Sequence, residues 1–120
     1  MRILVCGDRN WTDYELIVQT LQGLGRGPHR IIDGMARGAD SMGHRAAMIL
    51  WPREAHMRFA AQWQNYGRGA GPIRNLKMLK EGLPELVLAF HDAIERSKGT
   101  AHMLKIAREA EVPVRLVTHG

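Results

Sequence analysis

The sequence predicts an α/β domain with three layers, in which helices cover both faces of a mostly parallel five-stranded sheet. Two observations lead to this fold class. Short apolar runs alternate with longer segments whose apolar residues recur at helical spacing. Glycine-containing loops follow the first four apolar runs, as expected where a strand ends and a crossover begins. The 120 residues match the size of one domain, so we expect a single domain over residues 1–120.

The first half of the chain contains two predicted strands, each followed by a helix. Residues 2–6 (RILVC) are a short apolar run, and a helix is expected to follow with Thr12 at the N-cap of a capping box. Residues 30–33 (RIID) predict the second strand. Asp40 is then expected to cap a helix that runs to about Leu50.

The second half repeats this alternation. Residues 54–59 predict a weak third strand, and Pro72 suits the first turn of the helix that follows it. Residues 85–90 (ELVLAF) predict the fourth strand. The segment 97–100 leads into a last helix, and residues 114–117 (VRLV) predict the fifth strand. Four helices therefore flank five strands.

Composition sets broad limits on location and partners. The chain is 45% apolar and 24% charged, which is the ordinary globular range. Its one cysteine, Cys6, forms no internal disulfide and fits a reducing cytoplasm, so we expect a cytoplasmic protein. The first apolar run is too short for a signal peptide or a membrane span, and no membrane partner is expected. The net charge of +5 permits an anionic partner, either a nucleotide or a nucleic acid.

The loops after the first four predicted strands carry the main functional signal. In a parallel sheet these loops meet at one edge, where ligands bind. Each loop contains glycine, which lets backbone N–H groups approach a ligand closely. Each also contains cations that can bind phosphate. These cations are Arg9, Arg37, Arg68, Arg74, Arg96 and Lys98.

Standard catalytic and metal motifs are missing from the chain. There is no G-x-x-x-x-G-K-[ST] sequence, and the first loop lacks G-x-G-x-x-G, so neither a P-loop ATPase nor a typical dinucleotide fold is indicated. The chain contains no H-E-x-x-H, C-x-x-C or G-x-S-x-G sequence. The six histidines are scattered, and we expect no metal and no cofactor.

Four stretches together resemble a known family. ILVCGDRNWTD, DGMARGADSMGHRAA, QWQNYGRGAGPIRN and KGTAHMLKIAREAEVPV look like the YspA-like (YAcAr) branch of the SLOG superfamily, in order and over nearly the whole chain. The resemblance implies a Rossmann-like fold that binds nucleotides or nucleotide-derived ligands, in bacteria or their phages. Related SLOG branches include the lonely-guy phosphoribohydrolases and the DNA-processing protein that loads recombinase on single strands. The resemblance also implies dimers.

The resemblance transfers some catalytic residues and not others. Arg74 looks like the arginine that the phosphoribohydrolases place near a helix start, and Gly99 and Thr100 match part of their phosphate-binding turn. Met103 stands where those enzymes have a glutamate, and a thioether cannot accept a proton.

If cleavage occurs, another carboxylate, either Asp40 or Asp92, must replace that glutamate. The enzymatic prediction is therefore a phosphoribohydrolase-like activity, weakened by Met103, with Arg74 and Asp40 as the candidate catalytic residues.

The predicted site is one anion-binding pocket above the strand ends. The backbone amides of Gly99 and Thr100 are expected to hold a phosphate, with Arg74 as a bidentate partner. Trp11 either stacks on a base or packs near the start of the first helix. The predicted ligand-binding residues are Gly7, Arg9, Asn10, Trp11, Gly34, Arg37, Gly38, Ala39, Gly71, Arg74, Asn75, Gly99 and Thr100.

Two classes of function remain open at this point. The first is a nucleotide-binding protein that acts as a sensor or as an N-glycosidase-like hydrolase. The alternative is a single-stranded nucleic-acid-binding module, which should spread its cations along a face. Concentration of cations in the loops favours the small ligand. Large apolar residues around the middle of the chain, among them Met35, Met48, Trp51 and Trp63, predict a homodimer or a higher homo-oligomer.

Overall fold

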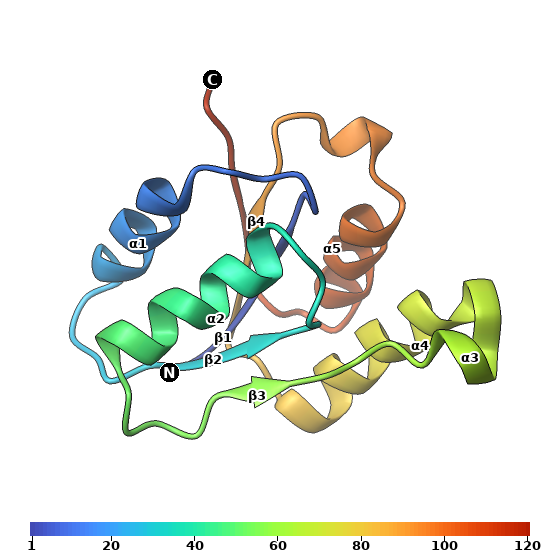
Figure 1. The fold of residues 1–120 in the computed structure, drawn as a ribbon, viewed down its shortest axis with the longest axis horizontal. Coiled ribbons are helices and arrows are strands. Elements are labelled where there is room, and N and C mark those ends of the chain that lie inside the picture. The colour runs from blue at the N-terminus through green and yellow to red at the C-terminus, as the bar shows by residue number, and fades with distance from the viewer.

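Five parallel strands form the centre of the molecule, in a computed structural model that describes residues 1–120 (Figure 1). The strands lie in the order β3-β2-β1-β4-β5, and every neighbouring pair is parallel. The prediction of a mostly parallel five-stranded sheet is confirmed. The strands are β1 (Arg2–Gly7), β2 (Arg30–Asp33), β3 (Met57–Arg58), β4 (Leu86–Phe90) and β5 (Val114–Val117).

Helices cover both faces of this sheet, so the fold is a Rossmann-like three-layer α/β/α sandwich (Figure 1). The helices are α1 (Tyr14–Gln22), α2 (Ala39–Leu50), α3 (Trp63–Tyr66), α4 (Ala70–Lys77) and α5 (Gly99–Glu109). The shorter turns are η1 (Gly67–Gly69), the π-helical η2 (Met78–Gly82) that continues α4, and η3 (Ile94–Arg96). Helices α1 and α2 pack on one face, whereas α4, η2 and α5 cover the other.

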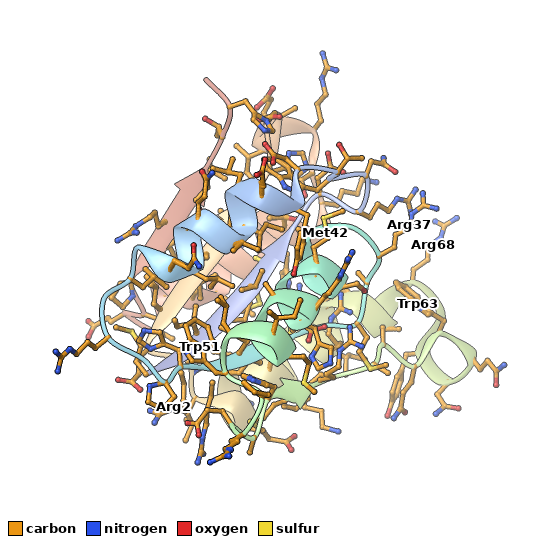
Figure 2. All side chains as sticks on the ribbon, turned by 60° about the vertical axis from the view of Figure 1, so that its left-hand side comes forward. Arg2, Arg37, Met42, Trp51, Trp63 and Arg68 are labelled. Atoms are coloured by element: carbon orange, nitrogen blue, oxygen red, sulfur yellow. The ribbon has the colours of Figure 1, made fainter.

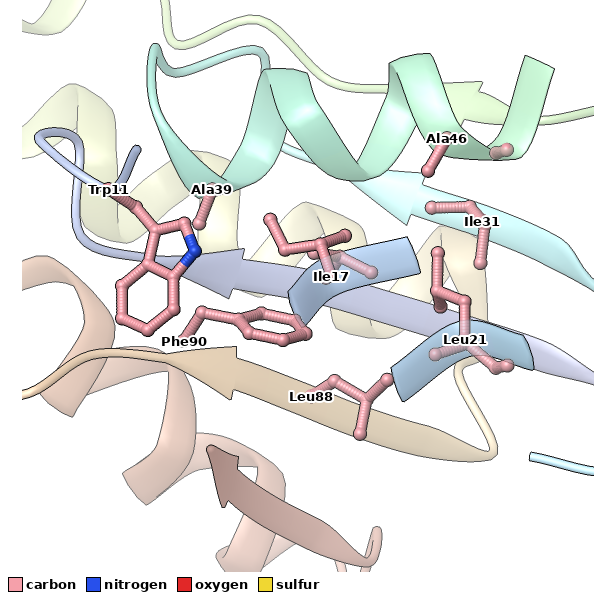
Figure 3. Close-up of a cluster of buried hydrophobic side chains, with 11 residues drawn as sticks. Trp11, Ile17, Leu21, Ile31, Ala39, Ala46, Leu88 and Phe90 are labelled. Carbon is pink, nitrogen blue, oxygen red and sulfur yellow. The ribbon is translucent and has the colours of Figure 1, made fainter. Parts of the chain in front are cut away.

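The two central strands supply both halves of the core. In β1, Ile3 and Val5 belong to the apolar cluster beneath α1 and α2, which Figure 3 shows around Ile17 and Phe90. Leu4 belongs to the opposite cluster, with residues of η2 and α5. Because side chains alternate along a strand, burial on both faces requires a continuous apolar run. This explains why β1 and β4 can be read directly from the sequence.

Two helix starts differ from their predictions. Asp13, and not Thr12, caps α1, because its carboxylate accepts a hydrogen bond from the backbone N–H of Leu16 at 3.1 Å. Helix α2 begins at Ala39 with Gly38 at its N-cap, so Asp40 lies inside the first turn. The side chain of Asp40 bonds to the loop before the helix instead of capping it.

The third strand is shorter than residues 54–59. Only Met57 and Arg58 pair with β2, opposite Ile32 and Asp33. The preceding residues are used in turns, since the N–H of Glu54 donates to the carbonyl of Trp51.

The surface retains several large apolar side chains. Ile49 on α2 and Trp63 on α3 are 66% and 59% exposed, and Met35 and Met48 are also exposed. Self-association stays a prediction that solution measurements must test. None of the helices combines the length and the apolar character that a membrane crossing requires.

Candidate functional site

A pocket of about 560 Å³ opens at the carboxyl end of the sheet. Strand β1 lies between β2 and β4, so the connections on either side of it run in opposite directions. Such a switch point is where open α/β sheets bind ligands. Three loops meet here: the first loop (residues 8–13), the second loop (34–38) and the fourth loop (91–98). The predicted residues that line the pocket are Gly7, Arg9, Asn10, Asp40, Arg74, Asn75, Gly99 and Thr100.

Gly7 lies at the floor of the pocket, where its missing side chain allows β4 and α2 to approach the end of β1 closely. It pairs with Phe90 across the β1–β4 ladder, and the N–H of Asp8 donates to the Phe90 carbonyl at 2.9 Å. A Cβ on Gly7 would lie 2.2 Å from that oxygen and 2.9 Å from the Cβ of Ala39. Ala39 therefore packs against the floor from α2 and does not line the pocket, which corrects its prediction as a ligand residue.

Two further predicted residues hold the loops together instead of lining the pocket. Gly38 has a φ of +76°, and a Cβ there would lie 2.4 Å from the carbonyl oxygen of Asp8. Arg37 donates from Nη2 to Oδ1 of Asn10 at 3.2 Å. Both contacts join the second loop to the first loop. Because Asn10 does line the pocket, Arg37 and Gly38 position one of its walls.

Arg74 reaches from α4 to the second loop. Its Nη1 donates to the carbonyl oxygen of Gly34, and its Nε donates to Oδ1 of Asn75 at 3.1 Å. A Cβ on Gly34 would lie 2.7 Å from Nη1, so this approach requires glycine. Gly34 is thus a partner of Arg74 and not a lining residue. Two of the three guanidinium nitrogens of Arg74, the predicted bidentate donor, already donate to the protein, so Nη2 remains for a ligand.

Asn75 connects α4 to the start of α5. Its buried amide Nδ2 donates to the carbonyl oxygen of Gly99 at 3.3 Å and lies 3.1 Å from Nδ1 of His102. Gly71, one turn earlier on α4, does not line the pocket but lies beside Trp63, which does. Asn75 therefore fixes the wall on which Gly99 and Thr100 lie.

Asp40 places a buried carboxyl group in the wall of the pocket. The residue is 5% exposed, and its Oδ2 accepts hydrogen bonds from the N–H groups of Gly34 (3.0 Å) and Ala36 (3.4 Å). Its Oδ1 has no partner in the protein. Burial raises the pKa of Asp40 to about 7, against the opposing effect of the Arg74 charge. Near neutral pH this carboxyl can therefore donate or accept a proton.

The start of α5 forms a cationic wall. Ser97 Oγ accepts the backbone N–H of Thr100 at 3.0 Å, so that amide is not available for a phosphate. This corrects the prediction for Thr100, whose hydroxyl alone can serve a ligand. The N–H groups of Lys98 and Gly99 have no acceptor in the protein. With the side chains of Arg96 and Lys98 nearby, the positive end of α5 favours an anion here.

Trp11 lies in the core and not in the pocket. Its indole Nε1 donates to the carbonyl oxygen of Asp13 at 2.9 Å, and its ring packs edge-on against Phe90 at 5.8 Å between centroids (Figure 3). The other face of the ring stacks on His119, with centroids 4.7 Å apart. The structure thus favours the packing interpretation and corrects the prediction that Trp11 contacts a ligand.

Sequence reasoning missed His91 as a pocket residue. His91 directly follows β4, and its Nδ1 accepts the N–H of Ala93 at 2.9 Å. In a neutral ring the proton must then reside on Nε2, which makes that atom a hydrogen-bond donor. Its position immediately after a strongly predicted strand was the available signal.

Two sulfur-containing residues limit the chemistry of the pocket. Met103 is 1% exposed and contributes a thioether to the wall, where the resemblance implies a glutamate. Burial raises the pKa of the Cys6 thiol, so it is not a thiolate nucleophile at neutral pH. No group of three or more His, Cys, Asp or Glu side chains is arranged to hold a metal ion. The groups available for chemistry are hydrogen-bond donors, cations, the His91 ring and the carboxyl groups of Asp40 and Asp8.

Comparison with known proteins identifies a relative over nearly the whole chain. The Gene 61 protein of Mycobacterium phage D29 is 33% identical over 119 residues, which cover 94% of this chain and 93% of that protein. The chain belongs to the family of this phage protein. The phage member fits the occurrence in bacteria and phages that the sequence resemblance implies. No family model matches the chain, and no solved structure matches it.

Proposed function

We propose that this protein binds a nucleotide or a nucleotide-derived small molecule in the pocket at the carboxyl end of the sheet. The observation that carries the proposal is the pairing, in one pocket of about 560 Å³, of a cationic wall with a buried carboxyl group. The volume lies in the range of about 300–1,000 Å³ that is typical of small-molecule sites. The SLOG resemblance supports the same ligand class.

The phosphate of the ligand occupies the wall at the start of α5. The unpartnered N–H groups of Lys98 and Gly99 and the hydroxyl of Thr100 supply hydrogen bonds there. Lys98 and Arg96 supply positive charge. Backbone donors at a helix N-terminus combined with cations form an effective phosphate site.

The ribose occupies the wall that carries Asp40. Oδ1 of Asp40 is an acceptor for a hydroxyl group, because Oδ2 already bonds to two backbone amides. An ionised carboxylate repels a phosphate, so the two ends of the pocket fix one orientation of the ligand. Nη2 of Arg74, the guanidinium nitrogen without a partner in the protein, donates to the phosphate.

Binding is the primary function in this proposal, and the protein acts as a sensor of its ligand. Hydrolysis of the N-glycosidic bond requires a carboxyl group near the ribose. Met103 cannot provide one, and in this proposal the buried Asp40 carboxyl, whose pKa is raised to about 7, handles the proton in any phosphoribohydrolase-like reaction, with Arg74 beside it. Asp92 cannot take this role from its observed place, because its carboxylate is bonded to His119 outside the pocket.

Calorimetry with adenosine 5′-monophosphate and adenosine tests the proposal. Replacing Arg74 with alanine removes a charged hydrogen bond and should weaken binding of the monophosphate by roughly ten- to a hundredfold. The affinity for adenosine, which has no phosphate, should change little in this variant. Arg53→Ala, at an exposed turn that connects α2 to the amino end of β3 and so lies at the opposite edge of the sheet from the pocket, is the matched control and should bind like the wild type.

Two results would contradict this account in different ways. Equal losses for the monophosphate and the nucleoside would show that Arg74 supports the second loop without reading the phosphate. A wild-type protein that binds none of the common nucleoside monophosphates would remove the small-ligand function. Thermal shift against the same panel gives an independent readout, because a ligand of the native state raises the melting temperature.

The second candidate is binding of single-stranded nucleic acid. It is favoured by Trp63 and Tyr66, which are 59% and 52% exposed, with Arg68 close by in the chain. Figure 2 shows Trp63, Arg68 and Arg37 on one side of the molecule. Exposed aromatic rings and cations are the elements of a stacking platform for bases. Binding of a short oligodeoxythymidine that falls steeply between about 50 and 200 mM salt and is weakened in Tyr66→Ala, outside the pocket, would support this candidate.

A further inference from the structure

His119, which follows β5, connects two loops that are far apart in the sequence. Its Nδ1 lies 2.6 Å from Oδ2 of Asp92, and its Nε2 lies 2.8 Å from Oδ2 of Asp13. Its backbone N–H also donates to Oδ1 of Asp92 at 2.7 Å. Both nitrogens of one ring are therefore bonded to carboxylates from different loops.

Stacking holds the same ring from a third direction. The imidazole lies on the indole of Trp11, with 4.7 Å between the centroids and 13° between the planes. Trp11 is buried and is itself packed against Phe90. The position of His119 is thus anchored to the core, although its side chain is partly exposed.

The two loops that His119 connects both form the pocket. Asp13 ends the first loop, which supplies Asp8, Arg9 and Asn10 to the pocket wall. Asp92 is the second residue of the fourth loop, which supplies His91, Arg96 and Lys98 to the pocket wall. The two contacts of His119 therefore connect two walls of the pocket.

The contacts require the doubly protonated form of the ring. Each carboxylate needs an N–H donor, and only the imidazolium has two. A neutral ring leaves one carboxylate facing a nitrogen lone pair. The hydrogen bonds to Asp92 and Asp13 raise the pKa of His119, and the same bonds lower the pKa of both carboxyl groups.

The sign of the pH dependence follows from these shifts. Asp13 and Asp92 are the charged groups that face the ring, and Trp11, the third contact, is uncharged. Because the pKa of His119 in the folded protein lies above the ordinary histidine value of 6.5, the contacts are complete below that pH. They are lost as the pH rises through the higher value of the folded protein.

We infer that His119 in its imidazolium form is a positioning residue that holds the first and fourth loops at the separation the ligand requires, so that ligand affinity falls when the ring loses its proton. The effect on affinity rests on the proposed function. The connection between the loops does not, and it can be measured without any ligand.

Two substitutions separate charge from packing. His119→Arg keeps a planar cation that can bond to both carboxylates and stack on Trp11, but it does not titrate near neutral pH. His119→Phe keeps an aromatic ring on Trp11 and removes both hydrogen bonds. The side chain is partly exposed, so neither change disturbs the buried core.

Amide hydrogen exchange without ligand tests the connection itself. Protected amides in the two loops include those of Asp8, Trp11 and Ala93. At about pH 6 we expect the first and fourth loops to exchange more slowly in the wild type and His119→Arg than in His119→Phe. As the pH is raised toward about 9, exchange in the wild type should approach that of His119→Phe, while His119→Arg stays slow. Equal exchange in all three proteins at the lower pH overturns the inference.

Affinity for adenosine 5′-monophosphate tests the consequence for the ligand. The ratio of the dissociation constants of the wild type and His119→Arg at one pH cancels the titration of the phosphate and of Asp40. We expect a ratio near one at about pH 6 that rises to as much as about fivefold as the pH is raised toward 9. A ratio that does not change with pH overturns the inference. If exchange behaves as expected but the wild type binds no nucleotide, the proposed function fails and the connection between the loops stands.

Discussion

Replacing Asp40 with asparagine should change how the stability of the protein depends on pH. Asp40 is 5% exposed, and burial raises its pKa from 3.8 to about 7. In the unfolded chain the same carboxyl ionises near the lower value. Between these two values the folded protein retains a proton that the unfolded chain has released. Stability therefore falls as the pH rises through this window.

The expected size of this effect follows from the pKa shift. One pH unit within the window corresponds to 1.36 kcal/mol for one proton, so about two units between pH 5 and pH 7 give roughly 3 kcal/mol. Above the pKa of the folded state the Asp40 carboxyl is ionised in both the folded and the unfolded protein, and stability falls no further on its account. In Asp40→Asn the side chain does not titrate, and its carbonyl oxygen can still accept the N–H of Gly34. The free energy of unfolding of the variant should thus rise by about 3 kcal/mol relative to that of the wild type between pH 5 and pH 7.

Urea unfolding at several pH values between about 5 and 8 measures this difference. Subtracting the wild-type free energy from that of Asp40→Asn at each pH cancels the groups that titrate equally in both proteins. A difference that stays constant over the range would refute the reasoning, because it would mean that the Asp40 carboxyl ionises in the folded protein as it does in the unfolded chain. A difference that rises as expected would establish a proton near neutral pH in the wall of the pocket, available for a ligand.

Two further predictions concern the elements that shape the pocket. Ser97→Ala removes the acceptor of the Thr100 N–H and should lower the free energy of unfolding by about 1 kcal/mol in urea, whereas Ser97→Asp should restore most of it. Gly7→Ala places a Cβ 2.2 Å from the carbonyl oxygen of Phe90 and should cost more than about 2 kcal/mol in thermal unfolding. Gly99→Ala, where a Cβ meets nothing within 4 Å, is its control, and equal melting temperatures for both alanine variants would contradict the steric argument.

The sequence alone determined the α/β class and the edge of the sheet at which the pocket lies. Strands β1 and β4 are buried on both faces, so their apolar runs have no polar interruptions and can be recognised without a structure. The helices follow from apolar periodicity. Once the strands are parallel, the loops that follow them must meet at one edge, whatever their detailed conformation.

Only the tertiary structure decided which loop residues line the pocket and which ones brace it. The sequence predicts Gly38 and Arg37 as ligand residues, because glycine together with arginine is typical of a phosphate-binding loop. In the folded protein they bond or pack against the first loop instead. Arg74 likewise uses part of its guanidinium for Gly34, 40 residues away in the chain.

The contacts of His119 could be predicted from the sequence even less than those of Arg37, Gly38 and Arg74. Its partner Asp13 lies 106 residues away, and nothing in the residues around either position indicates the contact. Local propensity and periodicity act over a few residues, so they specify strands, helices and caps. Contacts between side chains from distant loops depend on how the layers pack, and that packing is determined by the whole chain at once.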